Sequence, residues 1–463
     1  TSQNNIETSQ NNIETSQNNI ETSQNNIETS QNNIETSQNP KKPFPVNYWI
    51  VIIMEFIERG SYYGVLSVLS VYLTNSAADG GLGISFENAG IISSVTKPLL
   101  YLLPILSGAI ADRFGYRKIL TAAFAVMSAG YLASGISNGY ETVFASLLLM
   151  NIGAGVFKPI ISGTIALVTD KNNSGLGFGI YYWAINLGAF IFPLIIVPYL
   201  KTISYNYIFY MAAVATGSLL ILNMLYREPP RPSSAKPKGK VLIDALKVLK
   251  DMRFVSLTVI YSMFWILYFQ MFDSVLWYVN DYIDATPLNS AVNNILKAFT
   301  DNPQWKFDVE HITVINAGVI IALQFAVSSL VERFKPLPTM ITGIAFGSAG
   351  MAVLAINPDI WIIVSGIVIF TFGEMIAHPK FLSYVSLIAP ADKKALYLGY
   401  SFLYGVIGSG IGGVLGAKLY VRFIHESFQP EILWLSFSAI GILTITGLLV
   451  YNKIVKAQKI TDA

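Results

Sequence analysis

Three ionisable residues, Glu55, Glu58 and Arg59, lie inside an otherwise apolar run of the sequence. On a helix, Glu55, Arg59, Tyr62 and Tyr63 follow the spacing i, i+4, i+7, i+8 and share one face, with Glu58 beside it. The planar guanidinium of Arg59 matches a carboxylate, and a buried glutamate can hold a proton because burial disfavours its charged form. This face could therefore bind an anionic group and a proton. Alternatively, Glu55 and Arg59 simply neutralise each other within the helix.

Lys158 lies in another apolar run, shortly after Gly153 and Gly155, whose small size lets neighbouring helices approach closely. An ammonium at that depth needs an anion nearby, and Glu55 and Glu58 are the candidates within the protein. A carboxylate on a bound molecule could compete for the same ammonium, which would couple protonation of a glutamate to binding. The alternative is that Lys158 extends to the membrane surface.

Glu374 is an acid in an apolar run of the second half of the chain, one helical turn before His378. If the halves are pseudo-symmetric, Glu374 faces the first half, where it could meet a positive group or accept an interhelical hydrogen bond. His378 is more often a packed or hydrogen-bonded residue than a proton relay. Cations in the first half and an acid in the second would suit a zwitterion with a separated carboxylate and amine, as in a short peptide.

The composition indicates what class of protein holds these charges. The chain has 463 residues, of which 53% are hydrophobic and 13% charged, and its mean hydropathy is +0.50. It is too apolar for one soluble domain and too long for a single span, which indicates a polytopic membrane protein. With no cysteine and three scattered histidines we expect no metal site, and nothing indicates a nucleic-acid partner. No nucleophile–base pair or cofactor fingerprint indicates an enzyme.

Twelve apolar runs long enough to cross a bilayer can be distinguished between polar, proline or glycine breaks. The first six lie near residues 46–74, 87–110, 118–137, 140–169, 176–200 and 204–226, and the second six near 253–282, 309–333, 337–356, 359–388, 393–424 and 428–453. We therefore expect an all-α membrane protein with twelve transmembrane helices in two six-helix halves. That layout is typical of a transporter whose substrate binds between the halves at mid-membrane.

The predicted division of the chain is a tail at 1–43, helical bundles at 44–226 and 253–463, and a basic linker at 227–252. The tail repeats Thr-Ser-Gln-Asn-Asn-Ile-Glu, and one Ile per repeat cannot bury enough surface to offset chain entropy. We expect a disordered low-complexity tail or a sequence-assembly artefact. Lys and Arg cluster in the linker, after the second and tenth spans and at the end of the chain. The positive-inside rule places these regions, and both termini, in the cytoplasm.

The loop after the second predicted span contains Asp112, Arg113 and Arg117. This loop resembles the one between the second and third helices of the major facilitator superfamily. The resemblance implies a gating contact that helps to hold one conformation. The alternative is that these residues are ordinary positive-inside charge.

A longer set of motifs resembles the proton-dependent oligopeptide transporters, a branch of the same superfamily. The resemblance rests on Glu55-x-x-Glu58-Arg59-x-x-Tyr62-Tyr63-Gly64, Tyr101-Leu-Leu-Pro104, Gly155-x-x-Lys158-Pro159, Ile180-Tyr-Tyr182-x-x-Ile-Asn186-x-Gly188-Ala-Phe190, Phe264-Trp265, Ile315-Asn316 and Gly373-Glu374-x-x-x-x-Pro379-x-x-x-Ser383. It extends from Val46 to the end of the chain.

The resemblance implies proton-coupled import of di- and tripeptides by alternating access, with protons as the coupling ion and no other cofactor. It implies that Arg59 and Lys158 bind the peptide carboxylate and that Glu374 binds the amine. The other substrate-binding residues that it implies are Tyr62, Tyr63, Tyr101, Asn186, Trp265, Asn316 and Ser383. Proton coupling would involve Glu55 and Glu58, which switch between Lys158 and a proton, together with Glu374.

The sequence departs from the family pattern at two positions. Leu66 stands where the family has an arginine and Phe269 where it has an acid, and in the family those two positions form a charge pair. Losing both charges together leaves neither charge unpaired within the membrane, but it also removes a proposed proton site. Asp273, one helical turn beyond Phe269, is the candidate replacement. Alternatively, Asp273 is exposed near the outer mouth.

We expect a multi-pass protein of the plasma membrane that works as a monomeric transport unit, in contact with the lipid bilayer, protons and a peptide substrate. One alternative is a transporter of the same fold for another small anion or zwitterion, such as nitrate, an amino-acid conjugate or a drug. Another alternative is a membrane sensor or scaffold that does not transport.

Overall fold

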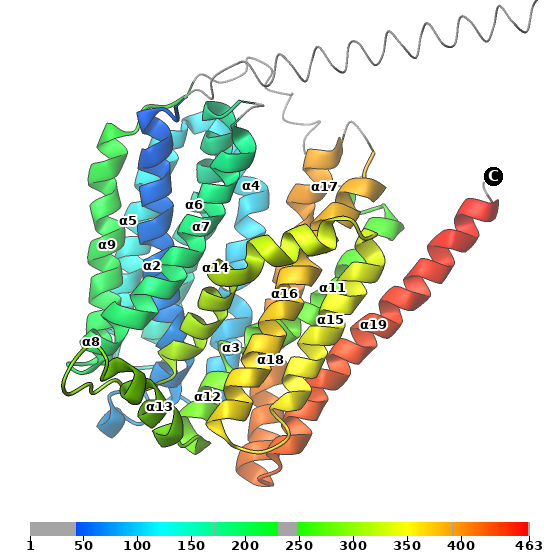
Figure 1. Cartoon of the computed structure of the whole chain (residues 1–463). Coiled ribbons are helices and arrows are strands. Elements are labelled where there is room, and N and C mark those ends of the chain that lie inside the picture. Colours follow the sequence, from blue (N-terminus) through cyan, green and yellow to red (C-terminus); the bar gives the residue numbers. More distant parts are fainter. Residues whose placement is uncertain (1–42, 171–172, 230–247, 391–392, 462–463) are drawn as a thin grey trace, which may run out of the picture.

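The computed structural model describes residues 43–170, 173–229, 248–390 and 393–461. Nearly all of the predicted tail (1–43) and most of the predicted linker (227–252) lie outside the described residues. The described chain forms helices joined by connections, and the helices are arranged as two bundles side by side (Figure 1).

The first bundle contains six spans. Its helices are α2 (Val46–Thr74), α3 (Phe86–Thr96), α4 (Leu99–Phe114), α5 (Tyr116–Gly135), α6 (Tyr140–Val168), α7 (Ser174–Ile191), α8 (Val197–Lys201) and α9 (Tyr205–Leu225). Two of the spans are divided. The second span breaks between α3 and α4 at Lys97 and Pro98, and the fifth passes from α7 to α8 through a π-helical turn, Phe192–Ile196.

The second bundle also contains six spans. Its helices are α11 (Met252–Gln270), α12 (Ser274–Tyr282), α13 (Thr286–Leu296), α14 (Glu310–Glu332), α15 (Pro336–Val353), α16 (Ile360–Ile388), α17 (Lys394–Ser401), α18 (Leu403–Tyr420) and α19 (Pro430–Thr461). The seventh span is divided into α11 and α12 by a turn that ends at Asp273. The eleventh span runs through α17 and α18 into a π-helical turn, Val421–Glu426.

Eleven spans of the described chain are long and apolar enough to cross a membrane. The twelfth is α2, which has 29 residues but carries Glu55, Glu58 and Arg59 near its middle. These charges lower the mean hydropathy of α2, but they do not shorten the helix. The expected all-α architecture of twelve spans in two halves is therefore confirmed.

The outer surface of the bundles is apolar where a membrane protein meets lipid. On α9, for example, Val214, Ile221 and Met224 are exposed, and spacings of seven and three residues place them on one helical face. The opposite face of α9 buries Phe209, Ala212 and other residues against the first bundle. An exposed apolar stripe of this kind is stable in hydrocarbon and costly in water.

Contacts at the helix ends define two faces of the molecule. The Asn47 amide donates to the Arg227 carbonyl oxygen over 2.7 Å, which brings the start of α2 beside the end of α9. The Tyr397 hydroxyl donates to Asp251 over 2.7 Å, which joins α17 to the start of α11. We call the side that holds these helix ends the linker face. The side that holds α13 and the α2–α3 connection is the outer face.

The two bundles meet closely at the outer face. Trp277 Nε1 of α12 donates to the Ser70 carbonyl oxygen of α2 over 3.0 Å, and the Val414 amide of α18 donates to Ser94 Oγ of α3 over 2.7 Å. At Gly90 of α3 the backbones approach so closely that an added Cβ would lie 2.7 Å from the Gly413 carbonyl oxygen. The described conformation is therefore closed at its outer face.

Candidate functional site

The charged residues of α2 are buried at the centre of the first bundle. Glu55 and Glu58 have no exposed surface, and Arg59 is 2% exposed. Arg59 donates from Nε and Nη2 to the two carboxylate oxygens of Glu58, over 2.5 and 2.6 Å, although the two residues are neighbours in sequence. Glu55 lies farther away, with 3.7 Å between its Oε1 and Arg59 Nε. The stronger ion pair on this helix is therefore Glu58–Arg59. The helical spacing had favoured a pair between Glu55 and Arg59.

Glu55 is only weakly partnered. Within the described residues, neither of its buried oxygens makes a hydrogen bond of normal geometry, and its contact with Arg59 is long. Its further neighbours are Lys158 on α6 and Tyr181 on α7, whose hydroxyl interacts with the carboxylate. A weakly partnered carboxylate in a buried site is costly as an anion, so this group is well placed to bind a proton or a mobile cation.

Lys158 lies inside the bundle and not at the membrane surface. Its ammonium is 5.6 Å from the centroid of the Tyr101 ring, and Tyr101 is itself buried. Besides Glu55 and Glu58, its electrostatic neighbours include His378 of the second bundle. Lys158 therefore faces the interface between the halves, where a ligand could reach it.

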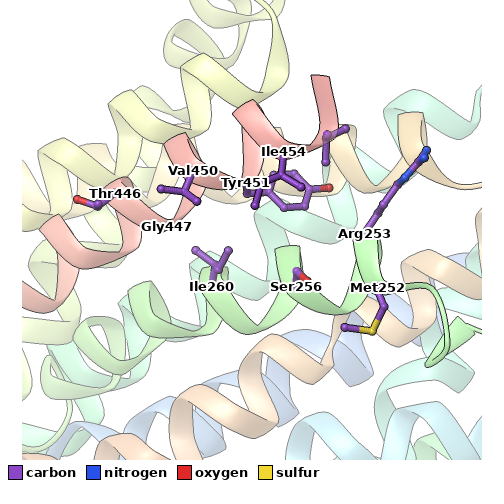
Figure 2. Close-up of a pocket in the computed structure, with 10 residues that line it drawn as sticks. Met252, Arg253, Ser256, Ile260, Thr446, Gly447, Val450, Tyr451 and Ile454 are labelled. Carbon is purple, nitrogen blue, oxygen red and sulfur yellow. The ribbon is translucent and has the colours of Figure 1, made fainter. Parts of the chain in front are cut away.

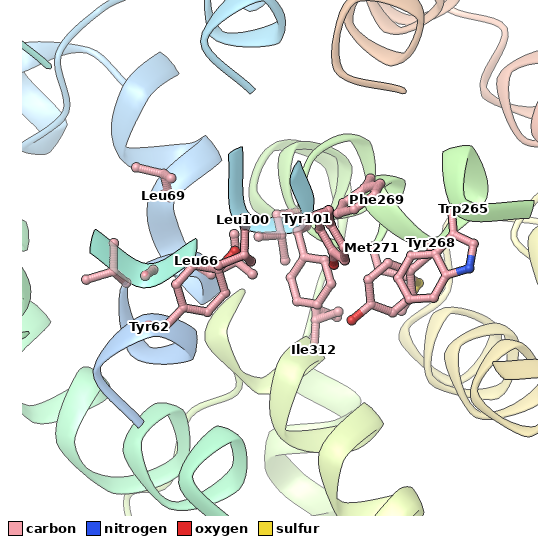
Figure 3. Packing of buried hydrophobic residues seen from close by; sticks show 14 of the residues in the cluster. Tyr62, Leu66, Leu69, Leu100, Tyr101, Trp265, Tyr268, Phe269, Met271 and Ile312 are labelled. Carbon is pink, nitrogen blue, oxygen red and sulfur yellow. The ribbon is translucent and has the colours of Figure 1, made fainter. Parts of the chain in front are cut away.

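Aromatic side chains from both halves surround this interface. Tyr62 and Tyr63 of α2 meet edge to face with ring centroids 5.4 Å apart. Tyr101 of α4 lies 6.1 Å from Trp265 of α11, and Figure 3 shows Tyr62, Tyr101 and Trp265 in one cluster. Phe269 also belongs to this wall, and sequence reasoning missed three further aromatic members, which are Tyr268, Phe272 and Tyr404.

The space among these rings is small in the described conformation. A cavity bordered by Arg59, Tyr62, Lys97, Tyr101 and Lys158 has a volume of about 20 Å³, enough for about one water molecule. A larger ligand would have to displace its walls. The charged groups are thus assembled while this part of the interface is closed.

Glu374 of α16 is part of a hydrogen-bonded group in the second bundle. Asn316 of α14 donates from its amide nitrogen to Glu374 Oε2 and to Thr371 Oγ1, over 3.0 Å in each case. The electrostatic neighbours of Glu374 include Tyr63 of the first bundle. The carboxylate therefore accepts an interhelical hydrogen bond and also faces the other half, while its binding of a positive group stays a prediction.

His378 and Asn186 have partners of a structural kind. The His378 ring meets Trp265 edge to face with centroids 5.4 Å apart, and its Nδ1 lies 3.5 Å from the Tyr261 hydroxyl. The Asn186 amide donates to the Tyr182 carbonyl oxygen one turn back on α7. His378 is therefore a packed residue, which is the more common role of a histidine at such a position. Asn186 lies on the span that carries Tyr181, next to Glu55.

Asp273 forms a buried ion pair that joins the two bundles. Lys97 Nζ lies 2.8 and 2.7 Å from the two carboxylate oxygens of Asp273, and Ser93 Oγ lies 3.3 Å from one of them. Lys97 is 4% exposed and Asp273 3%, so the expected alternative of an exposed Asp273 is wrong. Lys97 was missed in the sequence, where its position before Pro98 in an apolar run was the available signal.

A second ionic contact joins the bundles at the outer face. Lys201, at the end of α8, lies 2.6 Å from Asp308 and 3.0 Å from Glu310 at the start of α14. Glu310 is buried. Both interbundle ion pairs thus hold the two bundles together at the outer face of the described conformation.

Several predicted site residues lie elsewhere in this conformation. Ser383 is exposed and borders a separate groove with Lys380 and Phe325. Nine residues separate it from Glu374, which places it on the opposite side of α16, so it is not brought to the central cluster.

The residues of the predicted gating loop also lie away from the central cluster. Arg117 donates to the carbonyl oxygens of residues 223 and 224 at the end of α9. Arg113 is exposed beside Phe114, and the side chain of Asp112 lies outside the described part of the structure.

Comparisons with known proteins agree with this architecture. The family model of the Major Facilitator Superfamily matches residues 49–413. The solved structure of a peptide transporter POT in complex with sulfate superposes with a TM-score of 0.73 at 21% identity, covering 91% of this chain and 97% of that one. At this identity the superposition shows a common fold.

Curated relatives include transporters with different printed substrates. The Di-/tripeptide transporter of Lactococcus lactis subsp. cremoris is 32% identical over 209 residues, 42% of this chain and 42% of the relative. The Peptide transporter YePEPT of Yersinia enterocolitica is 22% identical over 466 residues, 81% of this chain and 88% of the relative. The Multidrug resistance protein MdtH of Escherichia coli is 24% identical over 405 residues, 87% and 93% of the two chains.

The chain spans about two-fifths of the length of the first curated relatives that it matches. The family model, in contrast, extends across both bundles and includes α2, α6 and α16, which carry the central charges. The chain therefore belongs to the Major Facilitator Superfamily, and its resemblance to the proton-dependent oligopeptide transporters of that superfamily is confirmed.

Proposed function

We propose that this chain is a proton-coupled symporter that imports di- and tripeptides by alternating access. The observation that carries the proposal is the placement of opposite charges on the two bundles, with Arg59 and Lys158 in the first and Glu374 in the second. A short peptide has a carboxylate and an ammonium separated by a backbone segment, so it complements this arrangement. The printed names of the Lactococcus and Yersinia relatives support the same substrate class.

The peptide carboxylate would bind between Arg59 and Lys158. Glu58 occupies the Nε and Nη2 side of the guanidinium, so the carboxylate would approach Nη1. The peptide ammonium would bind Glu374, which Asn316 orients through its amide. The peptide backbone and side-chain edges would contact the aromatic residues Tyr62, Tyr63, Tyr101 and Trp265, because flat aromatic walls accept varied groups. Asn186 would contact the peptide through its side-chain amide.

We assign the coupling proton to Glu55. A proton on this carboxylate removes its attraction for Lys158, so that the ammonium can bind the peptide carboxylate. After the bundles rock and the linker face opens, proton loss restores that attraction and weakens the hold on the peptide. Glu58 is held by Arg59, so it would join the cycle when a peptide competes for the guanidinium.

Asp273 is our candidate for a second proton site. Its carboxylate holds Lys97 across the closed outer face, so protonation would weaken that contact and favour opening to the outside. This assignment is consistent with Leu66 and Phe269, which leave their own positions uncharged. The acid lies one turn beyond Phe269, and the cation, Lys97, lies on the second span whereas Leu66 lies on the first. The chain therefore keeps a charge contact between the same two bundles.

The direction of import depends on orientation. We place the linker face and both termini in the cytoplasm of a plasma-membrane protein, because Lys and Arg gather in the linker and in the connections on that face. Each chain holds both halves of the proposed site, so we propose a monomeric transport unit. The absence of cysteine from the sequence makes the orientation testable by labelling single introduced cysteines with a reagent that does not cross membranes.

Uptake of dialanine into proteoliposomes tests the function. We expect an inward proton gradient to drive accumulation and an uncoupler to abolish it. Lys158→Ala should lose uptake, whereas Lys418→Ala, which removes an exposed lysine at the end of α18, should retain it.

The remaining outcomes separate the alternatives. Counterflow of dialanine without gradient-driven accumulation would refute proton coupling but keep the peptide site. Failure of both assays in a correctly inserted protein would favour another substrate. The MdtH relative makes a drug the first class to try, since the aromatic interface would also accept flat apolar molecules. Binding of a ligand with no flux under any gradient would favour a sensor.

A further inference from the structure

A groove on the membrane-facing side of the second bundle has no part in the proposed transport cycle. It lies between α11 and α19 near the linker face and has a volume of about 420 Å³ (Figure 2). Its walls include Ile260, Val450 and Ile454, and the last two are about half exposed. The groove is therefore a hollow in the apolar surface, set apart from the central charges.

The helices approach closely at one end of this groove and separate toward the linker face. An added Cβ on Gly447 of α19 would lie 3.0 Å from Ile260 Cγ2 of α11, so these residues form the closed end. Beyond it, α19 runs away from the rest of the bundle (Figure 1). From Ile260 to Arg253 the groove follows seven residues of α11, or about 10 Å. The hydrocarbon layer of one bilayer leaflet is about 15 Å thick, so the groove has the depth of the upper part of an acyl chain.

The open end of the groove carries polar groups. Arg253 borders it there, and Tyr451 directs its hydroxyl along the groove toward the arginine end (Figure 2). The Tyr451 hydroxyl oxygen is buried and makes no hydrogen bond of normal geometry among the described residues, and its polar neighbour is the Tyr384 hydroxyl. A buried hydroxyl with incomplete hydrogen bonding is unfavourable. A ligand with an oxygen acceptor at this level would satisfy it.

Among the described residues, the charges around the open end are mostly positive. Lys250 precedes α11 and Lys453 follows Tyr451 by two residues on α19, and both are exposed. The nearby acid, Asp251, is already engaged, since it accepts hydrogen bonds from the Arg253 and Phe254 amides and from the Tyr397 hydroxyl. Each basic residue near a membrane surface attracts anionic lipid with about 1 kcal/mol.

We propose that this groove is a binding site for one anionic glycerophospholipid of the leaflet at the linker face. The phosphate lies at Arg253, whose guanidinium matches phosphate geometry. An ester or glycerol oxygen accepts from the Tyr451 hydroxyl, and one acyl chain fills the apolar channel as far as Gly447. The site takes the lipid from the bilayer, because its long side is open to hydrocarbon and its polar end lies at headgroup depth.

Native mass spectrometry of the full chain with phosphatidylglycerol or phosphatidylcholine, at matched acyl chains, tests this site. We expect a saturable first phosphatidylglycerol, at least about tenfold tighter than phosphatidylcholine. Phosphatidylcholine carries the same phosphate, but its quaternary ammonium is repelled by Lys250, Arg253 and Lys453, so its net attraction to the basic end is smaller. Arg253→Gln should remove most of this preference. Gly447→Leu should weaken both lipids by filling the channel. Ala439→Leu introduces the same side chain at an exposed position two turns away on α19 and should change neither.

A second measurement keeps the test decisive if a variant folds poorly. A phosphatidylglycerol with a photoreactive acyl chain should crosslink the unaltered protein at α11 and α19 peptides near Ile260 and Gly447. The proposal is overturned if both lipids bind equally to the unaltered protein. It is also overturned if the preference survives Arg253→Gln in a folded variant, or if crosslinks spread evenly around the bundles.

Discussion

The ion pair between Lys97 and Asp273 should control the opening of the outer face. Its two N–O distances are 2.8 and 2.7 Å, and both side chains are almost fully buried between the bundles. Asp273→Asn leaves the ammonium of Lys97 buried without its counter-ion. Removing one partner of a buried pair costs about 3–5 kcal/mol, and about 1.4 kcal/mol changes an equilibrium constant tenfold. Even the lower value should shift the conformational equilibrium toward an open outer face by about 100-fold.

Spin labels can measure this shift because the chain contains no native cysteine. Ala78→Cys and Ser290→Cys place labels at exposed positions of the outer face, one on each bundle. We expect one short distance in the parent protein and a longer population in Asp273→Asn. Arg422→Gln is the matched control, because it breaks an exposed ion pair with Glu426 that joins no two helices across the interface.

A double variant separates charge from packing. Lys97→Met combined with Asp273→Leu removes both charges, and apolar replacement of a buried pair is often neutral or stabilising. The double variant should therefore return to the short distance. The reasoning is refuted if Asp273→Asn alone keeps the short distance, or if the double variant opens as far as the single one does.

Three further outcomes follow from contacts at the interface. Gly90→Val should hold the outer face open and abolish uptake, because its side chain would overlap α18, whereas Gly108→Ala, with no atom within 4 Å of the added carbon, should transport normally. Asn316→Ala should raise the KM for dialanine about tenfold by removing the donor that orients Glu374. Lys201→Met should lower the Tm in detergent, since it leaves a buried carboxylate without its cation. An unchanged KM or Tm would contradict the second and third expectations.

The number of spans could be predicted because each apolar run is a local property of the sequence. Even α2 was identified, since its length and its flanking apolar residues outweigh three charges. Breaks within spans were harder to predict. Nothing in the local sequence determines whether Lys97 before Pro98 ends a helix, bends it or extends toward water, because the answer depends on Asp273, which lies 176 residues away.

Side-chain partners at the centre were predictable only in part. Helical spacing brings Glu55 and Arg59 to one face, but a long guanidinium side chain can turn toward its sequence neighbour Glu58, and the structure has that arrangement. Ser383 shows a different limit. The motif that includes Glu374 and Ser383 is continuous in sequence, yet a helix turns by about half a revolution between them, so only one of the two can face the interface.

Both partners of the Lys97–Asp273 pair lie where their helices are interrupted. Lys97 follows α3, which has 11 residues, and Asp273 precedes α12, which has nine. Each interruption divides a span into a long segment toward the linker face and a short segment at the outer face, which is α3 in one span and α12 in the other. Because the ion pair joins the two interruptions, its loss would allow both short segments to move before either bundle has to rotate. We therefore expect admission of a substrate from outside to be a motion of small segments, separable in time from the larger rocking that carries the substrate across the membrane.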